Sequence, residues 1–112
     1  MNAFEVLAEP SRRRILDLVR DQEMSVNELV DNLSMSQPAV SKHLRVLRDE
    51  GFVEARVDKQ RRLYSVKAEP LEEVEAWLEP YRRLWTERLD ALARHLERMQ
   101  ETKEGQAGDT DQ

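Results

Sequence analysis

The chain has 112 residues, no cysteine and a formal net charge of −5. The length fits one domain and excludes architectures such as the eight-fold α/β barrel, which needs roughly 250 residues. The lack of cysteine excludes disulfides, iron–sulfur clusters and thiolate metal sites, and no apolar run approaches the ~20 residues that cross a bilayer. We therefore expect a soluble, cytoplasmic protein.

The charge is unevenly distributed along the chain. Residues 34–67 carry eight Lys or Arg against four Asp or Glu, whereas residues 1–33 and 68–112 are both acidic. Attraction to phosphate acts over about a Debye length, roughly 8–10 Å, so the local charge matters more than the total. The basic middle segment is therefore a candidate surface for nucleic acid.

The first two predicted helices lie at the start of the sequence. Residues 2–8 form a short helix with Asn2 as a possible cap, and Pro10 opens a second helix because proline favours the first turn. Apolar residues recur at helical spacing in the second helix, at Ile15, Leu18 and Val19. These positions predict one buried face.

The next two predicted helices are short and closely spaced. Ser25 and Glu28 form a capping box, so a helix begins there and ends near Leu33. Ser36 is the next candidate cap, and Gly51 ends the helix that follows it. Two such helices joined by about three residues are typical of a helix-turn-helix, with an ordinary helical hairpin as the alternative.

A β-hairpin is predicted next. Residues 52–57 and 62–66 alternate in the manner of strands, and the polar residues 58–61 lie between them. The tip and the second strand carry Lys59, Arg61 and Arg62. A helix-turn-helix followed by a basic hairpin is a winged helix-turn-helix, so the predicted fold class is mainly α with a β-hairpin wing (α+β).

The C-terminal part is predicted to be helical and then disordered. A helix starts at Glu69-Pro70, is interrupted at Glu79-Pro80 because a residue before proline resists the α region, and resumes until about Gln100. The second part carries apolar residues spaced four, three, four and three, as in a heptad repeat: Trp85, Leu89, Leu92, Leu96 and Met99. Residues 1–100 are thus the predicted DNA-binding domain with its dimerisation helices, and 101–112 a disordered acidic tail.

Three stretches resemble the ArsR-type winged-helix transcriptional repressors: 7–16 (LAEPSRRRIL), 36–53 (SQPAVSKHLRVLRDEGFV) and 56–64 (RVDKQRRLY). The run 77–85 (WLEPYRRLW) resembles a metal-independent branch of that family. The resemblance implies a homodimeric DNA-binding repressor, released by a metal, a small ligand, a redox event or no known signal. It also implies that the first and last helices pair across the dimer. The expected dimer interface consists of Phe4, Leu7, Tyr81, Trp85, Leu89, Leu92 and Leu96.

The metal sites of that family are not matched. Its metal-sensing members carry two cysteines before the helix-turn-helix, and here Ser25 and Asn27 stand in those positions, neither of them a soft ligand. A second family site uses paired Asp and His on the last helix. This chain has His95 near Asp90 and Glu97 without that spacing. A site built from these side chains of two subunits is the alternative to a solvated His95, and we predict no metal and no cofactor.

The predicted DNA contacts come from the second helix of the helix-turn-helix and from the wing. They are Ser36, Gln37, Ser41, Lys42, His43, Arg45, Lys59, Arg61 and Arg62. Gln37 can contact an adenine edge with its amide, Ser41 a base or a phosphate, and Lys42 and Arg45 phosphates. His43 is either structural or a phosphate contact.

The two wing arginines are predicted to have different roles. A wing arginine suits the narrow minor groove of A·T-rich DNA. Alternation along the strand lets one of Arg61 and Arg62 reach DNA, while the other faces the domain. A surface salt bridge is the alternative for these residues.

The sequence gives no support for an enzyme. It has no glycine-rich phosphate loop, nucleophile elbow or His-Glu-x-x-His motif. The main alternative is a dimeric winged-helix module that binds proteins and not DNA. A MarR-like regulator is disfavoured by the short chain. Operator, target genes, effector and the choice between activation and repression are not determined by the residues.

Overall fold

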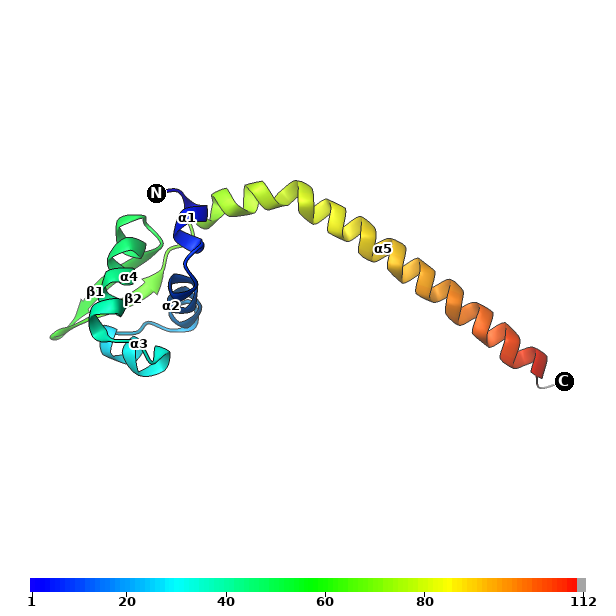
Figure 1. The fold of residues 1–112 in the computed structure, drawn as a ribbon, viewed down its shortest axis with the longest axis horizontal. Helices are drawn as coiled ribbons and strands as arrows, with labels where there is room; N and C mark the ends of the chain where they lie inside the picture. Colours follow the sequence, from blue (N-terminus) through cyan, green and yellow to red (C-terminus); the bar gives the residue numbers. More distant parts are fainter. Residues whose placement is uncertain (111–112) are drawn as a thin grey trace. The chain divides into compact units, whose positions relative to one another are not determined.

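A computed structural model describes the backbone of residues 1–110 and the side chains of residues 1–103. The chain divides into two compact units, Met1–Ala76 and Trp77–Gln112. Figure 1 shows the order of the helices and strands. None of the described helices is both long enough and apolar enough to span a membrane.

Four helices in the first unit follow from local capping. They are α1 (Ala3–Leu7), α2 (Pro10–Asp21), α3 (Val26–Leu33) and α4 (Gln37–Asp49). The Asn2 side chain accepts from the Glu5 amide at 2.8 Å, and the Ser25–Glu28 capping box is present in both directions. Ser36 caps α4 by accepting from the Ala39 amide at 3.3 Å. These hydrogen bonds confirm the predicted caps. The caps could be predicted because each joins partners only three residues apart.

Short turns orient α3 and α4. Ser34 ends α3 in the left-handed region with φ 54°, and its amide donates to the Val30 carbonyl. Gly51 follows α4 with φ +78°, a conformation that glycine adopts at low cost. The Phe52 amide then donates to the Leu47 carbonyl at 2.8 Å and turns the chain into the hairpin.

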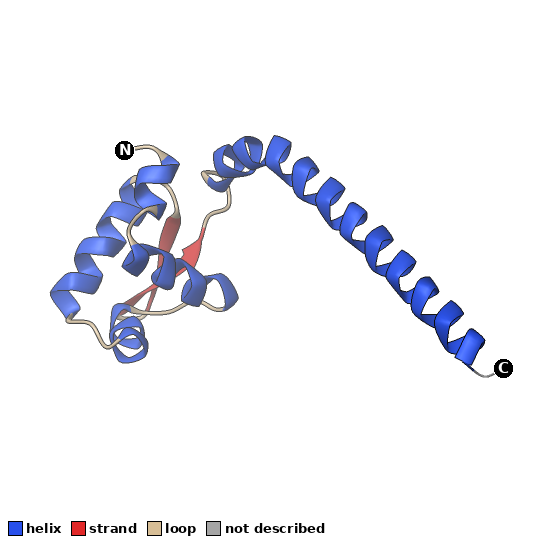
Figure 2. Cartoon of the chain, turned by 45° about the vertical axis from the view of Figure 1, so that its right-hand side comes forward, coloured by secondary structure: helices blue, strands red, loops and turns tan. Residues whose placement is uncertain are grey.

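The hairpin consists of β1 (Val53–Asp58) and β2 (Arg61–Val66), paired antiparallel. Its register extends from Val53 opposite Val66 to Asp58 opposite Arg61, so only Lys59 and Gln60 form the turn. The predicted four-residue link at 58–61 is therefore too long, because Asp58 and Arg61 pair with each other as the last residues of the ladder. In the two-residue turn, Lys59 takes a positive φ of 60°. Figure 2 shows the two strands beside the helices of the first unit.

One buried cluster joins the helices and the hairpin. Phe52, Ile15, Leu29 and Leu47 are its largest fully buried side chains. The helix-turn-helix and the wing therefore share one core, and the fold is a winged helix-turn-helix, as predicted.

The last helix, α5 (Leu71–Thr110), corrects the sequence prediction at both proline and tail. Pro80 lies inside a continuous helix, in place of the predicted interruption at Glu79-Pro80. A proline inside a helix removes one backbone donor, and strong helix formers on both sides of it let the helix continue. The helix also continues past Gln100 to Thr110, where a disordered tail over 101–112 was predicted. Residues 111 and 112 lie outside the described residues.

Candidate nucleic-acid interface

Helix α4 presents a polar side opposite its buried side. Val40, Leu44 and Leu47 are buried in the core. The predicted contacts of this helix are exposed, with the exception of His43: Ser36, Gln37, Ser41, Lys42 and Arg45. Since side chains at i, i+3 and i+4 share one face of a helix, burial of the apolar set directs the polar set outward.

His43 is placed differently from its neighbours. Its side chain is half-buried, and Nδ1 is buried without a hydrogen-bond partner in the described structure. A ring held partly inside the domain suits the structural role that the sequence allowed for this residue.

A groove between α4 and the hairpin gathers cationic side chains. Ser41, Arg45 and Arg48 line it from α4, and Arg62 lines it from β2. The other residues that line it are Val26, Leu44, Asp49 and Tyr64. The fold thus brings Arg62 next to Ser41 and Arg45, two predicted contacts of α4.

Arg48 is a further cation of α4 that was not among the predicted contacts. It is exposed and lines the same groove as Ser41 and Arg45. Its spacing was the available signal, because positions i, i+4 and i+7 lie on one helical face, and Ser41, Arg45 and Arg48 have that spacing. The cationic surface of α4 therefore extends further toward its C-terminal end than predicted.

A second hollow joins the start of α4 to the wing tip. Gln37 lines it together with Gln60, Arg61 and Arg62 of the hairpin, and with residues 25–28 at the start of α3. The residue proposed to contact a base edge and the basic wing thus border one surface. Lys59, in the turn, is exposed.

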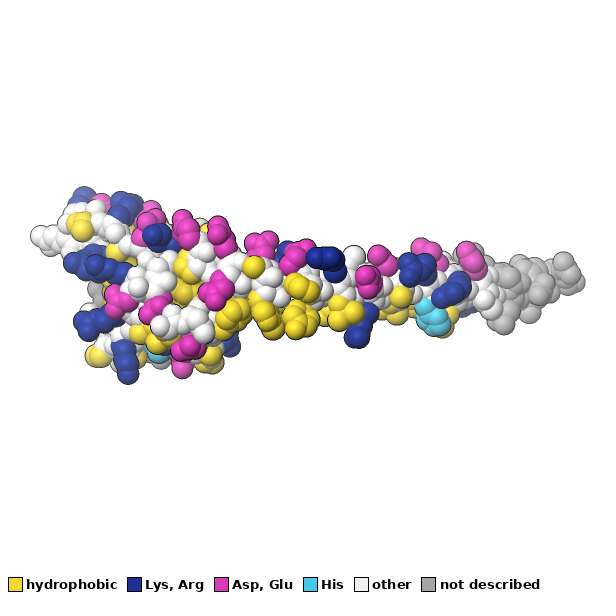
Figure 3. All heavy atoms as spheres, turned by 90° about the horizontal axis from the view of Figure 1, so that it is seen from above, with side chains coloured by type: hydrophobic (Ala, Val, Ile, Leu, Met, Phe, Trp, Pro, Cys, Tyr) yellow, Lys and Arg dark blue, Asp and Glu magenta, His cyan; other side chains and the backbone are white. Residues whose placement is uncertain are grey.

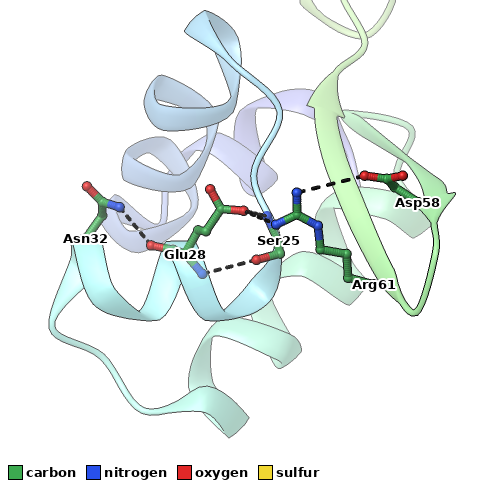
Figure 4. A network of polar contacts seen from close by, with 5 residues as sticks. All are labelled: Ser25, Glu28, Asn32, Asp58 and Arg61. Carbon is green, nitrogen blue, oxygen red and sulfur yellow. Dashed lines mark hydrogen bonds and ion pairs between the residues drawn. The ribbon is translucent and has the colours of Figure 1, made fainter.

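The two wing arginines have different surroundings. Arg61 donates from Nη1 to Oε1 of Glu28 at 3.2 Å, and its Nη2 lies 3.8 Å from Oδ2 of Asp58 (Figure 4). Arg62 lines the groove beside α4. Both side chains are exposed, so alternation along β2 does not bury either of them.

Another ion pair holds the first strand. Arg56 donates from Nε to Oε2 of Glu23 at 2.6 Å. The hydrogen bond and the nearby negative charge raise the pKa of Arg56 above its ordinary value. The Arg56 guanidinium therefore links β1 to the segment before α3.

The predicted dimer residues of α5 form an exposed apolar stripe. Figure 3 shows hydrophobic side chains gathered along one side of this helix. Trp85 is 71% exposed and Leu89 63%. Among residues with described side chains, the other large apolar residues exposed on the helix are Trp77, Leu78, Tyr81, Leu84, Leu92, Leu96 and Met99. The Trp77 and Tyr81 rings pack with centroids 4.9 Å apart. In α1, Phe4 is partly exposed, whereas Leu7 packs against the core of the first unit.

The candidate metal ligands do not gather within one chain. In the part of the chain that the structure describes, no three His, Cys, Asp or Glu side chains form a group able to hold a metal ion. His95 lines a shallow hollow of α5 with Arg98, Met99, Thr102 and Lys103, which places cations beside it.

Comparison with known proteins gives consistent matches. Residues 9–55 match the family model described as bacterial regulatory protein, arsR family. The chain is 37% identical over 82 residues to the transcriptional activator HlyU of Vibrio cholerae, covering 73% of each chain. It is 27% identical over 77 residues to the transcriptional repressor SdpR of Bacillus subtilis, covering 69% of this chain and 86% of that one.

A solved structure described as a possible transcriptional regulator for arsenical resistance has the same fold. It superposes with a TM-score of 0.65 at 36% identity, covering 72% of this chain and 84% of that chain. The winged helix-turn-helix is therefore supported by sequence and by structure together.

Proposed function

The chain belongs to the arsR family of bacterial regulatory proteins, and we propose that it is a homodimeric repressor that binds an imperfectly palindromic operator in double-stranded DNA. Two relatives are named a transcriptional repressor and a transcriptional activator, and the matched family model is described as a bacterial regulatory protein. Beyond regulation of transcription, the proposal includes a dimer, a symmetric operator, repression and a cytoplasmic location.

One observation carries the DNA-binding proposal. The exposed side of α4 and the basic side chains of the wing border the same two hollows, although they are separate in sequence. Lys42, Arg45, Arg48 and Arg62 supply positive charge for phosphates, and Gln37 supplies a bidentate amide for a base edge. A helix of this kind enters the major groove with its N-terminal residues at the bases.

The apolar stripe of α5 supports the homodimer. Soluble monomers rarely expose long contiguous apolar surface, and heptad spacing favours association of two helices. A two-fold dimer presents two recognition helices about one turn of DNA apart, roughly 34–36 Å, so the two half-sites should lie about 10–10.5 bp apart or at a multiple of that spacing.

Repression is proposed over activation on the strength of the family resemblance. One relative is named a repressor and another an activator, so the direction needs its own experiment. We propose metal-independent regulation because Ser25 and Asn27 occupy the positions at which metal-sensing members carry cysteine.

Genomic immunoprecipitation followed by a salt titration tests the proposal. Immunoprecipitation of the tagged full-length chain identifies bound fragments, and anisotropy on a labelled fragment measures affinity between low and moderate salt. We expect enrichment of palindromic sites, steeply salt-dependent binding and higher transcription of bound genes when the chain is deleted. Absence of salt-dependent DNA binding would favour the protein-interaction module instead.

A further inference from the structure

The start of α3 and the segment that leads into it are linked to the wing at three places. Two of the links are ion pairs and one is a pair of backbone hydrogen bonds: Glu23 with Arg56, Met24 with Tyr64, and Glu28 with Arg61. The backbone pair gives the hairpin a bridge from outside its two strands. The wing is therefore linked to the start of α3 at its middle and near its tip, and the link nearest the tip uses a predicted DNA contact.

Glu28 is held in place by the helix cap. Its Oε1 accepts from the Ser25 amide at 3.3 Å and from Arg61 Nη1 at 3.2 Å (Figure 4). The Ser25 hydroxyl, in a side chain that is buried, accepts in turn from the Glu28 amide at 3.3 Å. One carboxylate oxygen thus completes the cap of α3 and binds the wing, and the cap fixes where that oxygen lies.

Arg61 faces two carboxylates in the DNA-free chain. Glu28 lies on one side, and Asp58, its cross-strand partner, lies on the other with 3.8 Å between Oδ2 and Nη2. Arg61 is the first residue of β2, directly after the turn, and its side chain is 57% exposed. A DNA phosphate at the wing tip therefore competes with protein carboxylates for this guanidinium.

We propose that Glu28 is a positioning residue that holds Arg61 in an internal ion pair in the free chain and yields it to a DNA phosphate on binding. This inference rests on the proposed DNA-binding function and adds an anionic side chain of the same hollow to the determinants of affinity. Glu28 lowers affinity because the exchange breaks one charge-assisted hydrogen bond for each one formed. It also determines the position of the Arg61 guanidinium before DNA binds.

The test uses Glu28→Gln, which keeps the cap and weakens the ion pair. Glutamine at this position can still accept from the Ser25 amide, as in a capping box. The matched control is Asp31→Asn, because Asp31 lies one turn along α3, is exposed and takes no part in the contacts of Figure 4. Each change is also made in an Arg61→Gln background, and thermal unfolding checks that all variants fold.

Anisotropy on one operator fragment is measured for the full set of variants. We expect Glu28→Gln to tighten binding about two- to fivefold per wing, the size expected for freeing one exposed ion pair. We expect a smaller gain for Asp31→Asn, and a gain no larger than that for Glu28→Gln when Arg61 is already glutamine. Simple structural damage would weaken binding, so a gain that depends on Arg61 identifies positioning.

Two results would overturn the inference. One is an equal gain from Asp31→Asn, and the other is a gain from Glu28→Gln that persists in full without Arg61, because both indicate general electrostatics. If the wild-type chain binds DNA and either result is seen, only this inference fails. If the wild-type chain shows no salt-dependent binding, the proposed function fails as well.

Discussion

Arg12 donates from Nε to the backbone carbonyl oxygen of Val6 at 2.7 Å and from Nη2 to that of Glu5 at 3.1 Å. Arg13 donates to the carbonyl of Leu7. These carbonyls belong to α1, and the last turn of a helix lacks intrahelical donors and favours nearby cations. Two of three consecutive arginines therefore complete the end of α1, although a basic triplet in the sequence resembles a phosphate-binding patch.

Arg12→Ala is expected to lower the free energy of unfolding by about 1–2 kcal/mol, because it removes donors from carbonyls at a helix end. Urea denaturation at one fixed protein concentration measures this. Arg20→Ala is the control, since Arg20 is exposed and its guanidinium bonds to the neighbouring Asp21 on the helix surface; we expect a change within about 0.5 kcal/mol. A structural role for Arg12 also predicts an unchanged salt slope of DNA binding, and a slope reduced by about one would assign it to phosphate.

Leu92→Asp is expected to weaken the dimer and DNA binding together, because it places a charge within the apolar stripe of α5. Sedimentation at micromolar concentration measures the dimer. Ala93→Asp is the matched control: it adds the same charge about 100° around the helix. A wild-type chain that sediments as a monomer, or equal effects of the two substitutions, would contradict this interface.

Gln37→Ala and Lys42→Ala separate base recognition from phosphate binding. Loss of a bidentate base contact should cost about 1–3 kcal/mol per half-site and relax the preference at one base pair. Loss of a phosphate contact should weaken operator and random DNA alike and lower the salt slope by about one per contact. Competition with operator and random fragments distinguishes them. Equal losses on both fragments for Gln37→Ala would argue against base contact.

Addition of zinc, cadmium or arsenite is expected to leave DNA affinity unchanged, because the chain has no cysteine and the family's cysteine positions hold Ser25 and Asn27. Anisotropy with and without each ion measures this, and dialysis followed by metal analysis measures retention. Stoichiometric zinc that is retained by the wild-type chain and lost in His95→Ala would instead support a site shared between subunits.

Local sequence signals predicted much of the fold. The Ser25–Glu28 box and the Ser36 cap were readable because their partners lie three residues apart. The buried face of α4 was readable because Val40, Leu44 and Leu47 follow the helical period. The same period predicted the polar contacts on the opposite face. The local rule failed at Pro80, where the helix continues. The preference of Glu79, the residue before proline, for extended backbone is outweighed by the helix-forming residues on both sides.

The sequence by itself determined the helix starts, the winged order of elements, the basic middle segment and the apolar stripe of α5, because each depends on neighbours or on a repeat along the chain. Only the tertiary structure decided which cations are already engaged. Arg14 donates to the Leu33 carbonyl 19 residues away, and Arg61 to Glu28 33 residues away. Such partners are set by the packing of α2, α3 and the hairpin around one core, and no local pattern encodes a distance across that core.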